Sequence, residues 1–432
     1  MLPAEAPEYG RARAAQLIRA LAALLGVAAI AARCAWAIAV MPRPVSDAAS
    51  YWKLASRLAS HGLYGLGGLP TAYRPVGYPA ALASLIALFG EHESVFRGLN
   101  VGAAVVTLAA LFVLARRITG SDWTALLALA LYGAYPADVA YTSLALSEPL
   151  FNALSLAALA LLLGRRRSRA WAACAGVLLG LATLTRPHAL LLLPIGLAAL
   201  SCSQLGSRRL IGQACLVTAA LALTLAPWTA RNARVFHAFV PVSTNGGVNL
   251  LIGNNPAANG CYYVPKLVDA QLLAARAGAR DRIERELAED RGGARLALAW
   301  VRAHPRKALA LWRPKLRCLF DRAAGYAFFT RELAADKQRW FKRLQRVDDP
   351  YYRVLLWGGT LGALIAVAQS LVSRAARQQL LWLPGACCIG FVGVALLTFG
   401  DPRFHHPIMP WLALYAAYAA SLPLRLRARR SR

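Results

Sequence analysis

The sequence predicts an all-α protein, a polytopic transmembrane helix bundle of about 10 spans. Of its 432 residues, 58% are hydrophobic and only 16% are charged, whereas a soluble domain carries about a quarter charged residues. Apolar runs of about 17–25 residues recur, and each is long enough to cross a hydrocarbon core of about 30 Å. Short basic clusters follow every second run, which is typical of a chain that crosses a membrane repeatedly.

The predicted spans follow these apolar runs in chain order. They cover roughly residues 15–41, 96–115, 123–141, 146–163, 170–185, 189–205, 210–229, 353–372, 380–399 and 407–423. A further run of about 13 residues, from Tyr78 to Gly90, is too short to cross the hydrocarbon core. It is predicted to form an interfacial or re-entrant helix.

Basic residues at the ends of the spans predict the orientation of the chain. The clusters lie before or early in the first span and after the second, fourth, sixth, eighth and tenth: Arg11, Arg13 and Arg19; Arg116 and Arg117; Arg165, Arg166, Arg167 and Arg169; Arg208 and Arg209; Arg374 and Arg377; and the tail from Arg425 to Arg432. Because short cytoplasmic loops are rich in Lys and Arg, both termini are predicted to be cytoplasmic. The net charge of +29 then reflects topology and attraction to anionic lipid. No nucleic-acid partner is predicted, since the basic residues do not follow one soluble face with aromatics between them.

This topology divides the chain into three parts. Residues 1–230 form an N-terminal transmembrane module with a first outer loop at 42–95, residues 231–351 form a long outer loop, and residues 352–432 form a three-span module with a basic cytoplasmic tail. Charged and apolar residues alternate at helical spacing within 279–312, which predicts two amphipathic surface helices separated at Gly292 and Gly293. Cys261 and Cys318 lie in the same loop and would be able to form a disulfide if it faces an oxidising compartment.

Asp47, directly after the first span, is the most informative residue. A carboxylate close to lipid is costly unless it faces water, a partner or a substrate. The structural alternative is an N-cap for the helix that starts at Ala48, and the two roles are compatible. Arg74 lies in an irregular, proline-rich stretch of the same outer loop, where a solvated loop arginine is the alternative interpretation.

Other outer connections add charged side chains. Glu148 has apolar neighbours on both sides and is predicted to point into a protein cavity, although the dipole of its helix would also favour a carboxylate there. Arg186 stands between two apolar runs and needs an anionic partner or water. Arg231 and Asn232 end the seventh span, where an arginine is able to snorkel to the interface.

The last outer hairpin carries Asp401, Arg403, His405 and His406. Adjacent histidines usually point in different directions, so joint metal binding by both is the less favoured interpretation.

Together these residues combine two kinds of chemistry at one membrane face. Arginine forks suit phosphate oxygens. Carboxylates suit the deprotonation of a hydroxyl or amine, or the binding of a divalent ion. An enzyme that joins a phosphate-linked membrane donor to a polar acceptor needs both. Since the chain has neither a Walker A motif nor a GxGxxG segment opening a helix, a soluble nucleotide is not the predicted donor.

At these residues the sequence resembles the membrane-embedded GT-C glycosyltransferases, in the branch of the protein O-mannosyltransferases and the lipid A aminoarabinose transferase. The similar segments are, in chain order, VSDAASYWKLA, YRPVGYPAALASLIALFG, ALSEPLF, GLATLTRP, PWTARN with PVSTNGGVNLLIGNNP, and DPRFHHPIMPWLAL. The resemblance implies a sugar that moves, with inversion, from a polyprenyl-phosphate carrier to a glycan, lipid or protein acceptor. Transfer would take place on the outer side of a bacterial inner membrane.

The resemblance also implies roles for individual residues. Asp47 would be the general base or would help to bind a metal, and Glu148 would be a second catalytic candidate that binds sugar hydroxyls or tunes the site. The residues implied to hold the donor phosphate are Arg74, Arg186, Arg231 and Arg403. The candidates for binding the acceptor or sugar are Tyr51, Asp138, Asn232 and His405. Many relatives have paired acidic residues after the first span, whereas Ala48 follows Asp47 here, so a divalent metal is left open, with Asp47, His405 and His406 as candidate ligands.

Two other functions are compatible with this topology. A transporter or flippase for a lipid-linked saccharide would place polar residues at mid-span and at both faces. Here the span centres are mostly Ala, Leu and Val, and the polar groups gather at one face. A non-catalytic assembly subunit of an envelope complex is the third hypothesis.

Overall fold

The computed structural model describes residues 6–164, 168–202, 206–322, 325–330, 335–372 and 380–423. Over these residues the protein is almost wholly helical, and its two strands form one short antiparallel hairpin. The predicted all-α class is therefore confirmed. Several residues used to predict topology lie outside the described residues: Arg165, Arg166, Arg167, Arg374, Arg377 and the basic tail from Arg425.

The N-terminal half follows the predicted order of helices. It contains α1 (Ala6–Ala39), α2 (Ser46–His61), β1 (Gly65–Leu66), β2 (Leu69–Pro70), α3 (Gly77–Phe89), α4 (Ser94–Thr119), α5 (Asp122–Gly133), α6 (Pro136–Tyr141), α7 (Glu148–Leu162), α8 (Arg169–Thr185), η1 (Pro187–Leu191), α9 (Leu192–Ser201) and α10 (Ser207–Phe236). The span predicted at 123–141 is divided between α5 and α6. Pro136 starts the second helix at its first turn, because proline has no N–H for the ladder of a continuing helix.

The C-terminal half begins with a group of shorter helices. It contains α11 (Gly246–Gly253), α12 (Lys266–Ala275), α13 (Arg282–Ala303), α14 (Pro305–Ala310), α15 (Trp312–Phe320), η2 (Ala327–Thr330), α16 (Ala335–Val372), α18 (Trp382–Leu397), η3 (Pro402–Ile408) and α19 (Met409–Ala420). Cys261, between α11 and α12, forms a disulfide with Cys318 of α15. The bond joins the α11–α12 connection to α15, both within the predicted outer loop.

Four helices in the described part of the chain are long and apolar enough to cross a membrane: Gln16–Ala39, Ser94–Thr119, Ser207–Phe236 and Lys342–Val372. Shorter apolar helices stand beside them, at Gly77–Phe89, Glu148–Leu162, Arg169–Thr185, Pro187–Ser201 and Trp382–Leu397. Apolar helices thus run through the whole chain, while the predicted count of about 10 spans is not confirmed by helix length.

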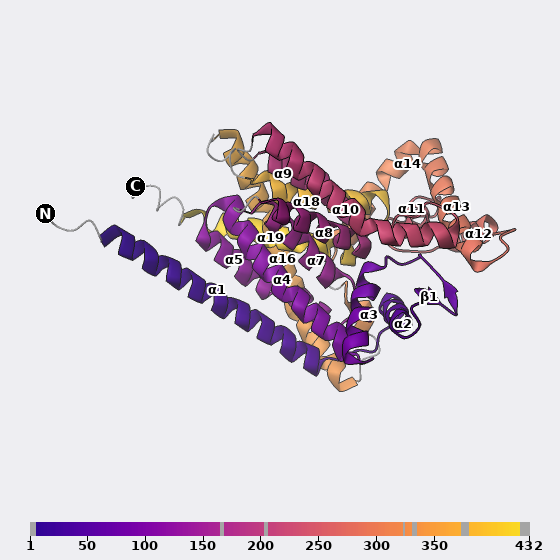
Figure 1. The fold of residues 1–432 in the computed structure, drawn as a ribbon, viewed down its shortest axis with the longest axis horizontal. Coiled ribbons are helices and arrows are strands. Elements are labelled where there is room, and N and C mark those ends of the chain that lie inside the picture. The colour runs from indigo at the N-terminus through magenta and orange to yellow at the C-terminus, as the bar shows by residue number, and fades with distance from the viewer. Residues whose placement is uncertain are drawn as a thin grey trace.

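The bundle is organised around α7, which packs between α4 and α8, while α8 packs on α10, and α19 packs on α5 and α16. Elements of the two predicted outer loops gather elsewhere. In Figure 1, α2, α3, β1 and the group α11–α14 lie at one end of the molecule, opposite the start of α1. Residues from distant parts of the sequence are thereby brought to one end of the bundle.

The predicted break at Gly292 and Gly293 is wrong. Helix α13 runs through both residues without interruption. A Cβ added at Gly293 would lie 2.8 Å from the carbonyl oxygen of Gly247, and one added at Gly292 would lie 2.6 Å from the Cβ of Ala275. The two glycines therefore allow α13 to approach α11 and α12 closely. The chain breaks instead between His304 and Pro305, where α14 begins.

Replacing Gly293 by alanine is expected to destabilise the protein by about 1–3 kcal/mol, because the added methyl group overlaps the backbone of α11. The matched control is Gly212→Ala in α10, where an added Cβ meets nothing within 4 Å. That change should be neutral or slightly stabilising. Thermal unfolding in detergent measures both, and equal midpoints for the two variants would contradict this packing.

Candidate active site

Asp47 lies in the first turn of α2, but its side chain does not cap that helix. Its two carboxylate oxygens accept hydrogen bonds from two arginines instead. Arg74 Nη2 donates to Asp47 Oδ1 (2.5 Å), and Arg403 Nη1 donates to Asp47 Oδ2 (2.8 Å). Ser46, just before it, has a φ of 51°, a conformation that is uncommon for residues other than glycine and that concentrates at functional sites. Asp47 therefore does not cap α2, and its carboxylate is engaged in ion pairs instead.

Arg403 joins Asp47 to a second carboxylate deeper in the protein. Its Nε and Nη2 both lie 2.9 Å from Glu148 Oε1. Arg186 Nη2 lies 2.8 Å from the same oxygen, and Arg186 Nε donates to Ser147 Oγ (3.0 Å). Arg186 was predicted to need an anionic partner or water, and Glu148 is its anionic partner. These contacts form one continuous set of ion pairs, called here the ion-pair chain: Arg74, Asp47, Arg403, Glu148 and Arg186.

Exposure changes along the ion-pair chain. The side chains of Arg74 and Asp47 are 23% and 21% exposed, whereas Glu148 is fully buried. The second oxygen of Glu148, Oε2, is buried without a hydrogen-bond partner among the described residues. A ligand that approaches from outside would therefore meet Arg74 and Asp47 first, and Glu148 would lie behind the arginines.

The two arginines also decide the charge of Asp47. Burial by itself raises the pKa of the Asp47 carboxyl group, but the positive charges of Arg403 and Arg74 outweigh it and hold the pKa below its ordinary value of 3.8. Asp47 is therefore an anion at neutral pH. To act as a base of useful strength, it must first lose the contact to at least one guanidinium group.

Aromatic rings cover the same arginines. The guanidinium carbon of Arg74 lies 5.3 Å from the ring centre of Tyr73 and 5.8 Å from that of Tyr51, and Arg403 lies 4.7 Å from the ring of Phe329. Such contacts favour a cation that is partly removed from water. Tyr51 is buried, so the structure places it under Arg74 and not in an open subsite.

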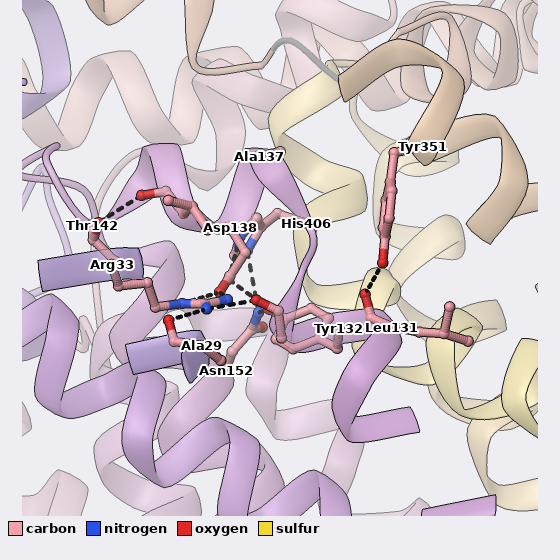
Figure 2. Close-up of polar contacts among 12 residues, drawn as sticks. Ala29, Arg33, Leu131, Tyr132, Ala137, Asp138, Thr142, Asn152, Tyr351 and His406 are labelled. Carbon is pink, nitrogen blue, oxygen red and sulfur yellow. Dashed lines mark hydrogen bonds and ion pairs between the residues drawn. The ribbon is translucent and has the colours of Figure 1, made fainter. Parts of the chain in front are cut away.

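Asp138 belongs to a different, buried cluster, shown in Figure 2. Its Oδ2 accepts from Arg33 Nη2 (2.5 Å), and its Oδ1 accepts from the hydroxyl of Tyr132 (2.7 Å). His406 Nε2 lies 3.1 Å from Asp138 Oδ1, and Asn152 contacts both Tyr132 and His406. This set, the Asp138 cluster, joins α1, α5, α6, α7 and η3 inside the bundle.

Sequence reasoning missed Arg33. It is completely buried in α1, within the run predicted to be the first apolar span. An arginine inside such a run is itself a signal, because an intramembrane charge needs a partner in the protein. Asp138 is that partner. Pairing Arg33 with Asp138 in the sequence would have assigned Asp138 to a different cluster from Asp47.

Arg231 braces the first outer loop and Asn232 braces the segment after α10, so neither joins the ion-pair chain. Arg231 donates to the carbonyl oxygens of Thr71 and Tyr64, each at 3.0 Å. Asn232 Nδ2 donates to the carbonyl of Val240 (2.9 Å), and its Oδ1 accepts from Arg231. In this structure both side chains are thus engaged in holding backbone segments.

Glu286, in α13, is a second residue that sequence reasoning missed. It accepts hydrogen bonds from the hydroxyls of Thr71 (2.6 Å) and Thr244 (2.5 Å), and from the backbone N–H of Ala72 (2.8 Å). These contacts tie the long loop to the segment that leads into Arg74. A glutamate on an amphipathic helix carries no sequence signal of such a role.

The candidate metal ligands do not converge. His405 Nδ1 faces the carbonyl of Leu319 (2.8 Å), and its ring stacks on Tyr352. His406 faces Asp138, and both oxygens of Asp47 face guanidinium groups. Within the described ranges, no group of three or more His, Cys, Asp or Glu side chains is arranged to hold a metal ion. The donor set around Asp47 does not fit a divalent cation, because positive charge already surrounds the carboxylate.

Residues 73–230 match the family model of the dolichyl-phosphate-mannose-protein mannosyltransferases. This stretch contains Arg74, Glu148 and Arg186. The chain also superposes over 95% of its length on the oligosaccharyltransferase AglB from the archaeon Archaeoglobus fulgidus, solved with an inhibitory peptide and a dolichol-phosphate, with a TM-score of 0.57 at 15% identity. The chain has the fold of the GT-C glycosyltransferases.

The GT-C fold confirms the resemblance seen in the sequence motifs. The chain spans about half of AglB, 51% of its length. A second structure of the Archaeoglobus fulgidus enzyme, tethered to an acceptor peptide, gives a TM-score of 0.56 at 14% identity, over 95% of this chain and 50% of that one. ArnT from Cupriavidus metallidurans, bound to undecaprenyl phosphate, is 16% identical over 95% of this chain and 78% of its own, but its TM-score of 0.38 is too low to support an inference. No curated protein sequence gives a match.

Proposed function

We propose that this protein is an inverting membrane glycosyltransferase. It would move a sugar from a polyprenyl-phosphate carrier to a glycan, lipid or protein acceptor of the cell envelope. The observation that carries the proposal is the partly exposed Asp47 carboxylate held between Arg74 and Arg403, in a chain with the GT-C fold. A carboxylate supplies the base for an incoming hydroxyl or amine, and paired arginines supply the charge that a leaving phosphate needs.

The guanidinium groups that would bind a phosphate are paired with carboxylates in this structure. In our proposal the donor phosphate contacts Arg74 and Arg403 from the exposed side and weakens their contacts to Asp47. Asp47 then takes the proton of the acceptor as the acceptor oxygen or nitrogen bonds to the anomeric carbon. The bond between that carbon and the phosphate oxygen breaks, its electron pair stays on the phosphate, and the arginines stabilise the added charge.

We assign Glu148 a positioning role in this reaction. It is fully buried and contacts Arg403 and Arg186 through one oxygen. It would fix both guanidinium groups before the donor arrives, which reduces the reorganisation needed in the transition state. Arg186 would then act through Arg403 or contact a phosphate oxygen that reaches deeper into the site.

We further propose that the site lies on the extracytoplasmic side of a bacterial inner membrane, with both termini cytoplasmic and about 10 spans. The disulfide between Cys261 and Cys318 supports this side, because disulfides persist in oxidising compartments. Consecutive short elements, such as η1 with α9 and η3 with α19, would complete crossings that no single long helix makes. The division of the chain at 1–230, 231–351 and 352–432 belongs to the same proposal.

Mass spectrometry of lipids and envelope glycans from a deletion strain tests the function. The expected result is a glycan or lipid that lacks one sugar, restored by the wild-type gene. Accumulation of the complete lipid-linked precursor would instead indicate a flippase and would overturn the proposal. Unchanged lipids and glycans would also overturn it.

A further inference from the structure

The segment between α11 and α12 is fastened to the hairpin that carries Arg403. Cys261 is bonded to Cys318, and the backbone N–H of Gly400 donates to the carbonyl of Gly260 (2.8 Å). At the start of the segment, Lys315 Nζ donates to Asn254 Oδ1 (3.0 Å) and to the carbonyl of Leu396 (2.8 Å). The segment is therefore held at its start and at Gly260 and Cys261, directly before Tyr262.

Tyr262 lies beside the hairpin that carries Arg403. Its ring packs on Phe399 with ring centres 5.0 Å apart, and Phe399 packs on Phe404. Yet 58% of Tyr262 is exposed. Burial raises the pKa of its phenol, as does the charge of Asp47, whereas the charge of Arg74 lowers it. The packing on Phe399 and, through it, on Phe404, which lie on either side of Arg403 in the sequence, places the exposed ring beside this hairpin.

A large, exposed aromatic ring on an anchored segment beside a charged site is suited to stacking on a sugar. The axial C–H groups of a pyranose form an apolar face, and an aromatic ring is a flat apolar surface with a polar hydroxyl at its edge. Because the disulfide and the Gly260–Gly400 hydrogen bond already fix the segment, stacking there would cost little further ordering.

We infer that Tyr262 is a saccharide-binding residue of this site, with its exposed ring stacked on the sugar that reacts beside Asp47. The inference rests on the proposed glycosyl transfer and adds a residue that recognises the sugar itself. The stacked sugar belongs either to the lipid-linked donor or to the acceptor glycan. The alternative is an aromatic ring that only contacts the membrane interface.

The chain provides matched controls. Tyr263 is 52% exposed and is adjacent to Tyr262. Tyr263→Ala therefore removes the same side chain from the same segment, and it would have the same effect if membrane contact were the reason for either ring. Tyr262→Phe keeps the ring and removes only the hydroxyl.

The donor part of the experiment measures binding to the full-length protein in nanodiscs. The probes are undecaprenyl phosphate alone and undecaprenyl-phosphate glucose, galactose and mannose. If Tyr262 stacks on the donor sugar, Tyr262→Ala loses about tenfold in affinity for the sugar-bearing lipid that the wild type prefers. The affinity of Tyr262→Ala for undecaprenyl phosphate alone stays unchanged. Tyr262→Phe and Tyr263→Ala keep the wild-type affinity for both undecaprenyl phosphate and the sugar-bearing lipid.

The acceptor part uses envelope glycan isolated from the deletion strain. If Tyr262 stacks on the acceptor, Tyr262→Ala raises the KM for this glycan about tenfold with little change in kcat, and donor affinity is unaffected. The inference is overturned if Tyr262→Ala behaves like Tyr263→Ala in both parts, or if Tyr262→Phe is as impaired as Tyr262→Ala. A wild-type protein that transfers nothing overturns the proposed function, whereas the donor-binding comparison still tests Tyr262.

Discussion

Asp47→Asn is expected to lower the rate of sugar transfer by about 10²–10⁴-fold, because asparagine keeps the shape of the side chain but cannot take the acceptor's proton. The variant should fold and insert normally, since its side chain is partly exposed and Arg403 keeps its contacts to Glu148. Turnover of the purified protein in proteoliposomes measures the effect.

The same variant should bind the donor phosphate at least as well as the wild type. Removing the Asp47 charge releases Arg74 and Arg403 from a competing anion, so affinity for undecaprenyl phosphate should stay the same or rise while turnover falls. The control is Asp269→Asn, an exposed carboxylate in the first turn of α12, which should change neither quantity. A near-normal turnover in Asp47→Asn would remove Asp47 as the base.

Asp138→Asn is expected to have the largest effect on stability, a loss of about 3–5 kcal/mol. Arg33 is completely buried, and Asp138 is its partner in the Asp138 cluster. Asparagine keeps an acceptor oxygen but carries no charge, so the Arg33 guanidinium is left as a buried cation without its counter-ion, hydrogen-bonded only to neutral oxygens such as the carbonyls of Ala29 and Gly133. Thermal unfolding and yield in detergent measure the loss.

A double-mutant cycle tests this reason directly. Arg33→Met combined with Asp138→Asn removes both charges and should recover much of the stability that the single change loses. The surface pair of Arg116 and Asp122 is the control, because both side chains are substantially exposed. Asp122→Asn should cost less than about 1 kcal/mol. If Asp138→Asn were as mild as Asp122→Asn, the buried pair would have no special importance.

Much of the fold was predictable because its signals are local. Apolar runs predicted the ends of α3, α7 and α8 to within two residues and those of α4 to within four. The prediction of a helix break was wrong because the two glycines are required by a contact between helices and not by the local backbone. Gly292 and Gly293 are typical of a helix break, but here they serve the close contact of α13 with α11 and α12. A sequence does not reveal whether a glycine is needed for its backbone freedom or for its lack of a side chain.

The sequence by itself determined the helical class, the kinds of charged side chain available for a site, and the family resemblance on which the proposed function rests. Only the tertiary structure decided which charges meet. Asp47 and Arg403 are 356 residues apart, and Glu148 and Arg403 are 255 apart. Asp138 and Glu148 look equivalent in the sequence, yet one neutralises Arg33 and the other holds Arg403 and Arg186. Ion pairs depend on distances of a few ångströms between side chains, and helix packing sets those distances.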